Sequence, residues 1–226
     1  MTVIFLLRHA HSEANGAGIL AGQIPGVHLS KIGKREAKTF AKNYRNVKFD
    51  QIYVSPLERC SETIAPYLAD SSRNRKSAKP VISNLNFVEM DYGAWSGLKL
   101  QKLALKPLWR KIQNNPITVT FPEGESFRSL NSRVKKGLLE IARLHKKKNV
   151  LVVTHGDVIK IATAIALNMD FNDFQKIAID PASITAISIT GNKFRVLAVN
   201  SKAEPVAVDG QRFALGGGAG PKVKRK

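Results

Sequence analysis

The segment Val3-Ile4-Phe5-Leu6-Leu7-Arg8-His9-Ala10-His11-Ser12 decides the fold of this chain. Five consecutive apolar residues stop at an arginine-histidine pair, and small and polar residues follow at once. An apolar run of this length predicts a strand that is buried on both faces of a sheet. Ligands of open α/β sheets bind at the carboxyl ends of the strands. A fixed positive charge and a nucleophilic imidazole at that position suit phosphate chemistry.

Further apolar, β-rich runs alternate with helical patterns along the chain. Additional strands are predicted at 51–54, 80–83, 150–154, 182–189 and 194–200, and helices at 33–44, 57–69, 126–145 and 157–167. Ser30 is the predicted N-cap of the first helix, and Pro66 is expected to kink or end the second. This alternation predicts an α/β protein with three α/β/α layers and a mostly parallel central sheet. The last two strands are separated only by residues 191–193, so we expect an antiparallel strand pair at one edge.

Two stretches depart from this alternation. Residues 89–122 form an irregular excursion in which one short helix is expected at 102–113. After Asn200 the pattern fades, and a glycine-rich, basic end follows. We therefore expect one domain over residues 1–205 and a flexible tail over residues 206–226.

Composition restricts the class of protein. The chain has 226 residues, of which 43% are apolar, which is enough for one domain with a substantial core. No apolar run approaches the ~20 residues that cross a bilayer, and no leader pattern precedes the first strand. The lone Cys60 can form neither an internal disulfide nor a cysteine metal site. We expect a cytoplasmic protein with no membrane partner.

The charge balance is strongly basic, with 36 Lys and Arg against 17 Asp and Glu, a net +19. Such a surface attracts anionic ligands and is compatible with salt-sensitive binding of nucleic acid. However, no arginine-rich repeat, aromatic-interleaved basic patch or zinc spacing accompanies the charge. A solvated basic surface is therefore favoured over nucleic acid as the explanation, although nucleic acid is not excluded.

Three later segments repeat the theme of polar residues that follow a strand or a turn. They are Ser55-Pro56-Leu57-x-Arg59-x-x-x-Thr63, Glu89-x-x-x-Gly93-x-Trp95-x-Gly97 and His155-Gly156. Together with Arg8-His9-Ala10-His11-Ser12-Glu13-Ala14-Asn15, they resemble the four ordered motifs of the histidine phosphatase superfamily, the phosphoglycerate mutase-like proteins. The chain is most similar to the branch of small bacterial phosphatases, which implies a phosphoglycerate mutase-like fold.

This resemblance implies one phosphate site built from five catalytic residues. Arg8 and Arg59 would bind phosphoryl oxygens through forked hydrogen bonds, and His155 would add a third donor. His9 would attack phosphorus as a neutral imidazole and form a phosphohistidine. Glu89 would protonate the leaving alkoxide and then activate water. The neighbouring arginines lower the pKa of such a carboxyl group whereas burial raises it, and the sequence does not decide between them.

Further residues are expected around this site. Asn15 would donate to the substrate, and Gly22 and Gly156 would lie beside it. Asp91 and Glu123 are alternatives to Glu89 as the carboxylate. This set requires no metal and no other cofactor.

Departures from the family pattern distinguish between two related activities. Ala21 stands where cofactor-dependent mutases carry a hydroxyl residue, and Asp157 stands where they usually carry asparagine. We therefore expect a metal-independent phosphatase that acts on a small phosphomonoester. A cofactor-dependent phosphoglycerate mutase and a weakly catalytic anion- or RNA-binding module are the alternatives. The particular phosphomonoester and the oligomeric state, with a homodimer as one option, stay open.

Overall fold

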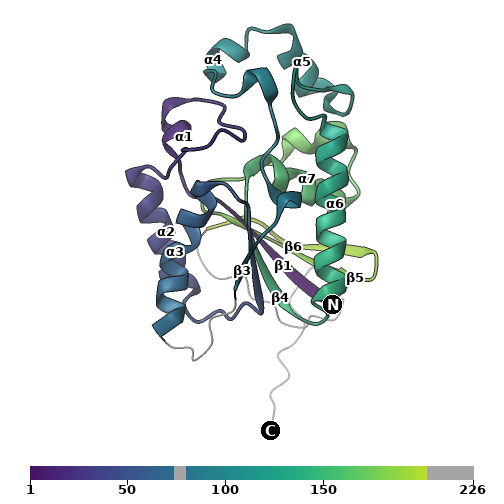
Figure 1. Ribbon diagram of the computed structural model, residues 1–226. Coiled ribbons are helices and arrows are strands. Elements are labelled where there is room, and N and C mark those ends of the chain that lie inside the picture. The colour runs from purple at the N-terminus through teal and green to yellow at the C-terminus, as the bar shows by residue number, and fades with distance from the viewer. Residues whose placement is uncertain (74–79, 203–226) are drawn as a thin grey trace.

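Six strands form one sheet in the computed structural model, which describes residues 1–73 and 80–202 (Figure 1). The strands are β1 (Thr2–Arg8), β2 (Gln51–Val54), β3 (Val81–Ser83), β4 (Asn149–Thr154), β5 (Ile184–Thr190) and β6 (Lys193–Ser201). Their order across the sheet is β3-β2-β4-β1-β5-β6. The pairs β3-β2, β2-β4 and β4-β1 are parallel, whereas β5 is antiparallel to both β1 and β6. The expected mostly parallel sheet with an antiparallel pair at one edge is confirmed.

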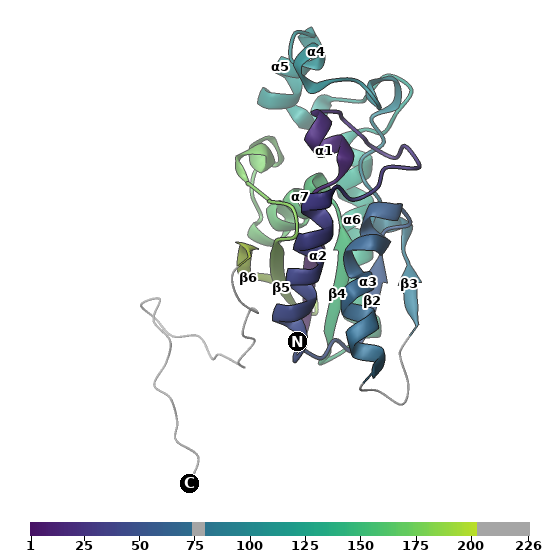
Figure 2. The same ribbon diagram turned by 90° about the vertical axis from the view of Figure 1, so that its left-hand side faces the viewer.

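The helices lie on the two faces of this sheet and above one of its ends (Figures 1 and 2). They are α1 (Glu13–Ala17), α2 (Lys31–Tyr44), α3 (Glu58–Arg73), α4 (Leu100–Leu103), α5 (Pro107–Asn114), α6 (Phe127–Leu144) and α7 (Gly156–Leu167). Short 3₁₀ helices occupy Leu85–Phe87, Gly93–Trp95, Pro116–Thr118 and Phe171–Lys176.

Strand β1 contributes to the hydrophobic core on both faces of the sheet. Because successive side chains of a strand alternate between faces, Ile4 and Leu6 pack on the side of α6 and α7. Val3, Phe5 and Leu7 pack on the other side, where α2 and α3 lie. All five side chains are buried. The three-layer arrangement expected from the uninterrupted apolar run is therefore present.

Helix α3 continues past Pro66 to Arg73, so the expectation that the helix could end at Pro66 is wrong. A proline inside a helix removes one backbone hydrogen bond. Here Ile64 and Tyr67, one on either side of the proline, are buried against the sheet and hold the helix in place.

Strand β5 begins at Ile184, two residues later than expected, because Ala182 adopts a φ of 55° that an extended strand does not allow.

The single short helix expected at 102–113 is two helices, α4 and α5. Pro107 is the first residue of α5, and the residue before a proline avoids helical backbone angles, so the helix breaks there. Figures 1 and 2 show α4 and α5 above the carboxyl ends of the parallel strands. They cover the end of the sheet at which the four sequence motifs predict the phosphate site.

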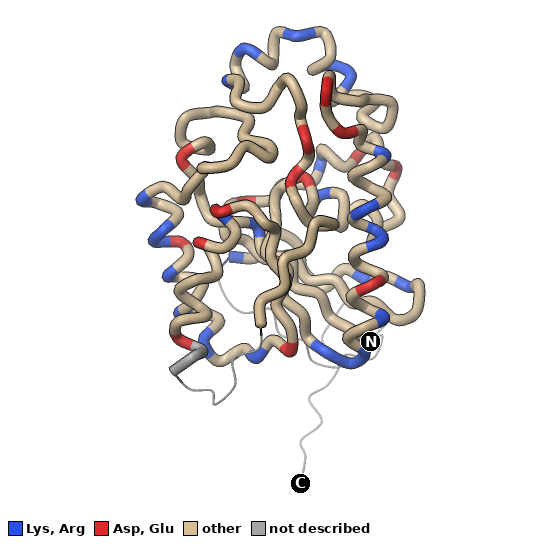
Figure 3. Tube along the Cα trace, in the orientation of Figure 1, with Lys and Arg blue, Asp and Glu red and all other residues tan. Residues whose placement is uncertain are grey.

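Two further observations concern the chain as a whole. Within the described residues, no helix is both long enough and apolar enough to span a bilayer. Lys and Arg residues occur on α2, on α6 and along residues 99–111, so the basic charge is spread over several sides of the protein (Figure 3). The tail predicted at 206–226 lies outside the described residues.

Candidate active site

The parallel pairing of β1 with β4 brings the two histidine motifs together. Arg8 is opposite Thr154 in the register, and the backbone N–H of His9 donates to the carbonyl of Thr154 (2.8 Å). His9 and His155 therefore leave the same edge of the sheet from adjacent strands. Their ring centroids lie 5.2 Å apart, with an angle of 59° between the planes.

The His9 side chain is held in an orientation that suits a nucleophile. It is buried, and its Nδ1 lies 2.8 Å from the carbonyl oxygen of Ala10. That carbonyl can only accept, so Nδ1 carries the proton and Nε2 keeps its lone pair. Burial, together with the positive charges of Arg59 and Arg8, lowers the pKa of His9 to about 3. The imidazole is therefore neutral at physiological pH.

Two guanidinium groups converge near this ring, and each is anchored by one backbone carbonyl. Arg8 donates from Nη1 to Ile179 (2.6 Å), and Arg59 donates from Nη2 to Gly22 (2.7 Å). Arg8 Nε and Arg59 Nη1 are also buried, but they have no hydrogen-bond partner among the described residues. Because an unpaired buried N–H is costly, these two groups are available for the oxygens of a bound anion.

The side chain of His155 is completely buried and lies beside the ring of His9, at the phosphate end of the cavity. Its Nε2 lies 2.7 Å from Ser55 Oγ and 3.5 Å from the thiol of Cys60. Its Nδ1 has no hydrogen-bond partner among the described residues and lies 4.0 Å from Glu89 Oε2. Burial and the charge of Arg59 lower the pKa of His155 well below its ordinary value.

The carboxyl group of Glu89 faces the same space as His9. Burial and the negative charge of Asp157 raise its pKa to about 7, against the opposing effect of Arg59. Burial therefore outweighs the neighbouring arginine, a balance that the sequence could not decide. Of the two alternative carboxylates, neither Asp91 nor Glu123 lines the cavity, and Asp91 accepts a hydrogen bond from the N–H of Gly93 (2.9 Å).

The backbone of Glu89 is positioned by side chains that sequence reasoning did not single out. Arg133 on α6 donates to the carbonyls of Val88 (2.7 Å) and Glu89 (3.1 Å), and it pairs with Glu125 (2.8 Å). Gln23 donates to the same Glu89 carbonyl (2.8 Å). No local pattern marks Arg133, because an arginine on a helix is ordinarily a surface residue.

A second positioning residue, Thr63, lay within a recognised motif but had no assigned role. Its hydroxyl accepts from the N–H of Ala10 (2.9 Å) and donates to the carbonyl of Arg59 (2.6 Å). The hydroxyl thus joins the loop that follows His9 to the helix that carries Arg59. Its spacing from Arg59, one helical turn, is the only sequence signal for this link.

The three residues expected to contact substrate all line the cavity. The side-chain oxygen of Asn15 caps α1 by accepting from Ser12 N–H (3.0 Å), so only its amide nitrogen is left to donate. Gly22 has a φ of 53°, and its carbonyl anchors Arg59. A Cβ on Gly156 would lie 3.3 Å from Arg8 Nε, so the absence of a side chain there leaves room for the guanidinium.

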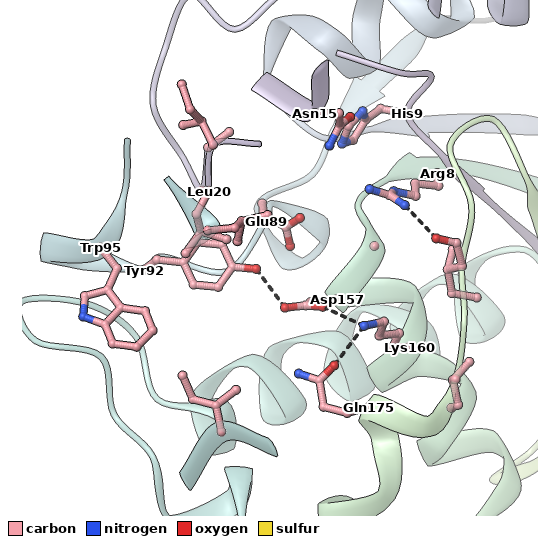
Figure 4. Close-up of a pocket in the computed structure, with 18 of the residues that line it drawn as sticks. Arg8, His9, Asn15, Leu20, Glu89, Tyr92, Trp95, Asp157, Lys160 and Gln175 are labelled. Atoms are coloured by element: carbon pink, nitrogen blue, oxygen red, sulfur yellow. Dashed lines mark hydrogen bonds and ion pairs between the residues drawn. The ribbon is translucent and has the colours of Figure 1, made fainter. Parts of the chain in front are cut away.

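These groups open into one cavity of about 610 Å³ (Figure 4). The cavity is polar where Arg8, His9, Arg59 and Glu89 meet, and its far wall is apolar. That apolar wall consists of Leu20, Trp95, Trp109, Ile112, Phe121 and Phe127. Among the described residues, no three His, Cys, Asp or Glu side chains are grouped so that they could hold a metal ion.

Two hydrogen bonds and one ion pair connect Tyr92, Asp157, Lys160 and Gln175 along one side of the cavity (Figure 4). Tyr92 donates to Asp157 (2.8 Å), Lys160 lies 3.6 Å from Asp157, and Lys160 donates to Gln175 (2.9 Å). The carboxylate that distinguishes this chain from the mutase pattern is thus paired within the protein.

Comparison with known proteins agrees with this arrangement. The model of the histidine phosphatase superfamily (branch 1) matches residues 4–202. The chain belongs to the histidine phosphatase superfamily. The resemblance carried by the four sequence motifs is therefore confirmed, and with it the assignment as a phosphoric monoester hydrolase.

Individual members of the superfamily align over almost their whole length. The chain is 31% identical over 202 residues to phosphoserine phosphatase 1 of Hydrogenobacter thermophilus, covering 88% of this chain and 92% of that one. It is 27% identical to the adenosylcobalamin/alpha-ribazole phosphatase of Escherichia coli, covering 88% and 96%. The crystal structure of the alpha-ribazole phosphatase from Shigella flexneri matches with a TM-score of 0.78 at 24% identity, covering 91% and 100%. At that identity the match shows the shared fold.

Proposed function

We propose that this histidine phosphatase hydrolyses a small phosphomonoester through a phosphohistidine on His9, with Glu89 as the general acid and then the general base. One observation carries the proposal. A neutral imidazole with a free Nε2, two unpartnered guanidinium N–H groups and a carboxyl group of raised pKa meet in one cavity. These are the nucleophile, the charge stabilisers and the acid that phosphoryl transfer requires.

In the first step, His9 Nε2 attacks phosphorus and the bond from phosphorus to the alcohol oxygen breaks. Arg8 Nε and Arg59 Nη1 stabilise the negative charge on the equatorial oxygens, and His155 Nδ1 adds a third donor. Glu89 is protonated below its raised pKa and transfers that proton to the leaving oxygen, so the alcohol leaves as a neutral molecule.

In the second step, the Glu89 carboxylate takes a proton from a water molecule whose oxygen attacks phosphorus. The phosphorus–nitrogen bond breaks, and Nε2 recovers its lone pair. Inorganic phosphate leaves, and Glu89 is again protonated. No step uses a metal or any other cofactor.

The relatives support hydrolysis of a small phosphorylated molecule, because their names specify phosphoserine and alpha-ribazole phosphatase activities. A mutase must hold a second anionic group. Ala21 and Asp157 supply no donor for such a group, so we favour hydrolysis over phosphoglycerate mutation. The expected cytoplasmic location stays a prediction, and a homodimer and nucleic-acid binding stay open.

Trapping the intermediate tests the proposal. Protein mixed with a ³²P-labelled alkyl phosphate and quenched should carry label that survives base and is released by acid, the stability expected of phosphohistidine. The label should be absent from His9→Ala and present in His28→Gln, because His28 is exposed, pairs with Glu62 and does not line the cavity. Turnover should be unchanged in EDTA. Full activity in His9→Ala, or loss of activity in EDTA, would contradict the mechanism.

A further inference from the structure

The cavity is much larger than a phosphoryl group and has a wall of different chemistry. Its volume of about 610 Å³ is in the range that holds a whole drug-sized ligand. Trp95 and Trp109 are stacked, with ring centroids 6.4 Å apart and planes 16° from parallel. Phe121 packs edge-on against Trp95 at 5.5 Å. An alcohol that fills this space would therefore meet aromatic side chains, of which Trp109 is the most exposed, as well as the polar side chains of Tyr92 and Asp157.

The charged groups beyond the phosphate end are already paired. Four cations line the described cavity: Arg8, Arg59, Lys160 and Lys176. The two arginines lie at the phosphate end, Lys160 pairs with Asp157 (3.6 Å), and Lys176 pairs with Asp173 (2.8 Å). A second carboxylate or phosphate on the substrate would therefore meet no unpaired cation beyond the phosphate end of the described cavity, and Asp157 would repel it.

We infer that the cavity selects phosphomonoesters whose alcohol carries a large, flat, uncharged ring system, with Trp109 as a specificity-determining residue. This inference rests on the phosphatase function proposed above. Trp109 is only half-buried and comes from α5, so its ring is the part of the aromatic wall most accessible to a ligand. Binding there removes apolar area of the substrate from water and stacks its ring on the indole.

The experiment compares esters with similar alkyl leaving groups, so that chemical reactivity does not confuse the result. We expect kcat/KM for 2-(1-naphthyl)ethyl phosphate to exceed that for ethyl phosphate by about 100-fold. Trp109→Ala should reduce the ratio of the two kcat/KM values about tenfold. Leu105→Ala is the matched control, because Leu105 precedes the same helix but is 86% exposed and does not line the cavity. If Trp109→Ala does not fold, Trp109→Gln, which keeps more of the side-chain volume, is measured in its place.

Three results would overturn the inference. They are equal kcat/KM for the two esters, a preference that folded Trp109→Ala and Trp109→Gln proteins retain in full, or a preference for 3-phosphoglycerate over both. Failure of the proposed function is recognised separately, as absence of His9-dependent phosphate release from every ester. In that case, calorimetric binding of the two esters to His9→Ala still tests whether the cavity prefers an aromatic alcohol. Tighter binding of the naphthyl ester that depends on Trp109 supports the aromatic site, and equal binding refutes it.

Discussion

The imidazoles of His9 and His155 lie 5.2 Å apart because Arg8 is paired with Thr154 in the neighbouring parallel strand. The site therefore depends on strand register, and not on a flexible loop, for its two central rings. A one-residue slip would send one of them to the other face of the sheet. This rigidity explains how two rings of low pKa can be kept beside the buried Arg59 and the partly buried Arg8.

The two-sided hydrogen bonding of the Arg59 guanidinium should be essential for catalysis. Nη2 is occupied by the carbonyl of Gly22, and Nη1 is left for substrate, so one group must bond in two directions. A lysine ammonium cannot reproduce that geometry. Arg59→Lys should therefore lower kcat/KM by about 100-fold, as measured by phosphate release. The exposed Arg110→Lys should behave like the wild type, and comparable activity in both variants would show that charge alone suffices.

Activity on alkyl phosphates should fall as the pH rises through about 7, because Glu89 must be protonated to act as the acid. The neutral form of His9 persists down to about pH 3, so His9 sets no limit near neutrality. Asp157 helps to raise the pKa of Glu89, so Asp157→Asn should move the alkaline limb to lower pH. The control is Asp173→Asn, an exposed carboxylate in an ion pair with Lys176. A pH profile of kcat/KM that does not move in Asp157→Asn would exclude this coupling.

Glu89 should make the folded state less stable at alkaline pH. Its folded pKa is raised from 4.5 to about 7, so the unfolded chain ionises first. The stability that the protonated form supplies is complete below about pH 4.5 and is lost as the pH rises through 7. Glu89→Gln should therefore raise the Tm by several degrees at pH 8 and leave it nearly unchanged at pH 4. Thermal unfolding followed by circular dichroism measures both. An equal Tm shift at the two pH values would mean that packing, and not ionisation, is responsible.

Gly33 should tolerate no side chain. A Cβ at this position would lie 2.0 Å from the carbonyl oxygen of His11, so the start of α2 presses on the loop that follows His9. Gly33→Ala should cost about 2 kcal/mol of unfolding free energy and lower kcat as the loop shifts. Gly16→Ala is the matched control, because its Cβ would meet only His11 Cε1 at 3.4 Å. Denaturant unfolding and steady-state kinetics of both variants would check this, and equal stabilities would contradict it.

The sequence predicted the layers well because the signals were local and strong. The apolar run of β1 and the Ser30 cap, which accepts from Gly33 N–H, lie where expected. The sequence did not predict the break between α4 and α5 before Pro107 or the continuation of α3 past Pro66. Pro107 follows a turn and begins a helix, whereas Pro66 lies between buried residues whose packing only the tertiary structure reveals.

The site was predictable in its residue types but not in its electrostatics. Sequence motifs could propose Glu89, yet its raised pKa depends on burial and on Asp157. The supporting Arg133 comes from α6, far along the chain, and carries no signature. The aromatic wall was equally hidden, because Trp95 and Trp109 meet only when the segment above the sheet folds back.

The strand order has a consequence for biosynthesis. Strand β1 lies between β4 and β5 in the sheet, and both of these strands are translated far later than β1. At ordinary elongation rates of about 5–20 residues per second, its partners arrive roughly 10–35 s afterwards. Throughout that interval, five consecutive apolar residues of β1 have no neighbouring strand on either edge. In a nascent chain of this design, the apolar residues of β1 therefore have no strand partner until β4 and β5 emerge.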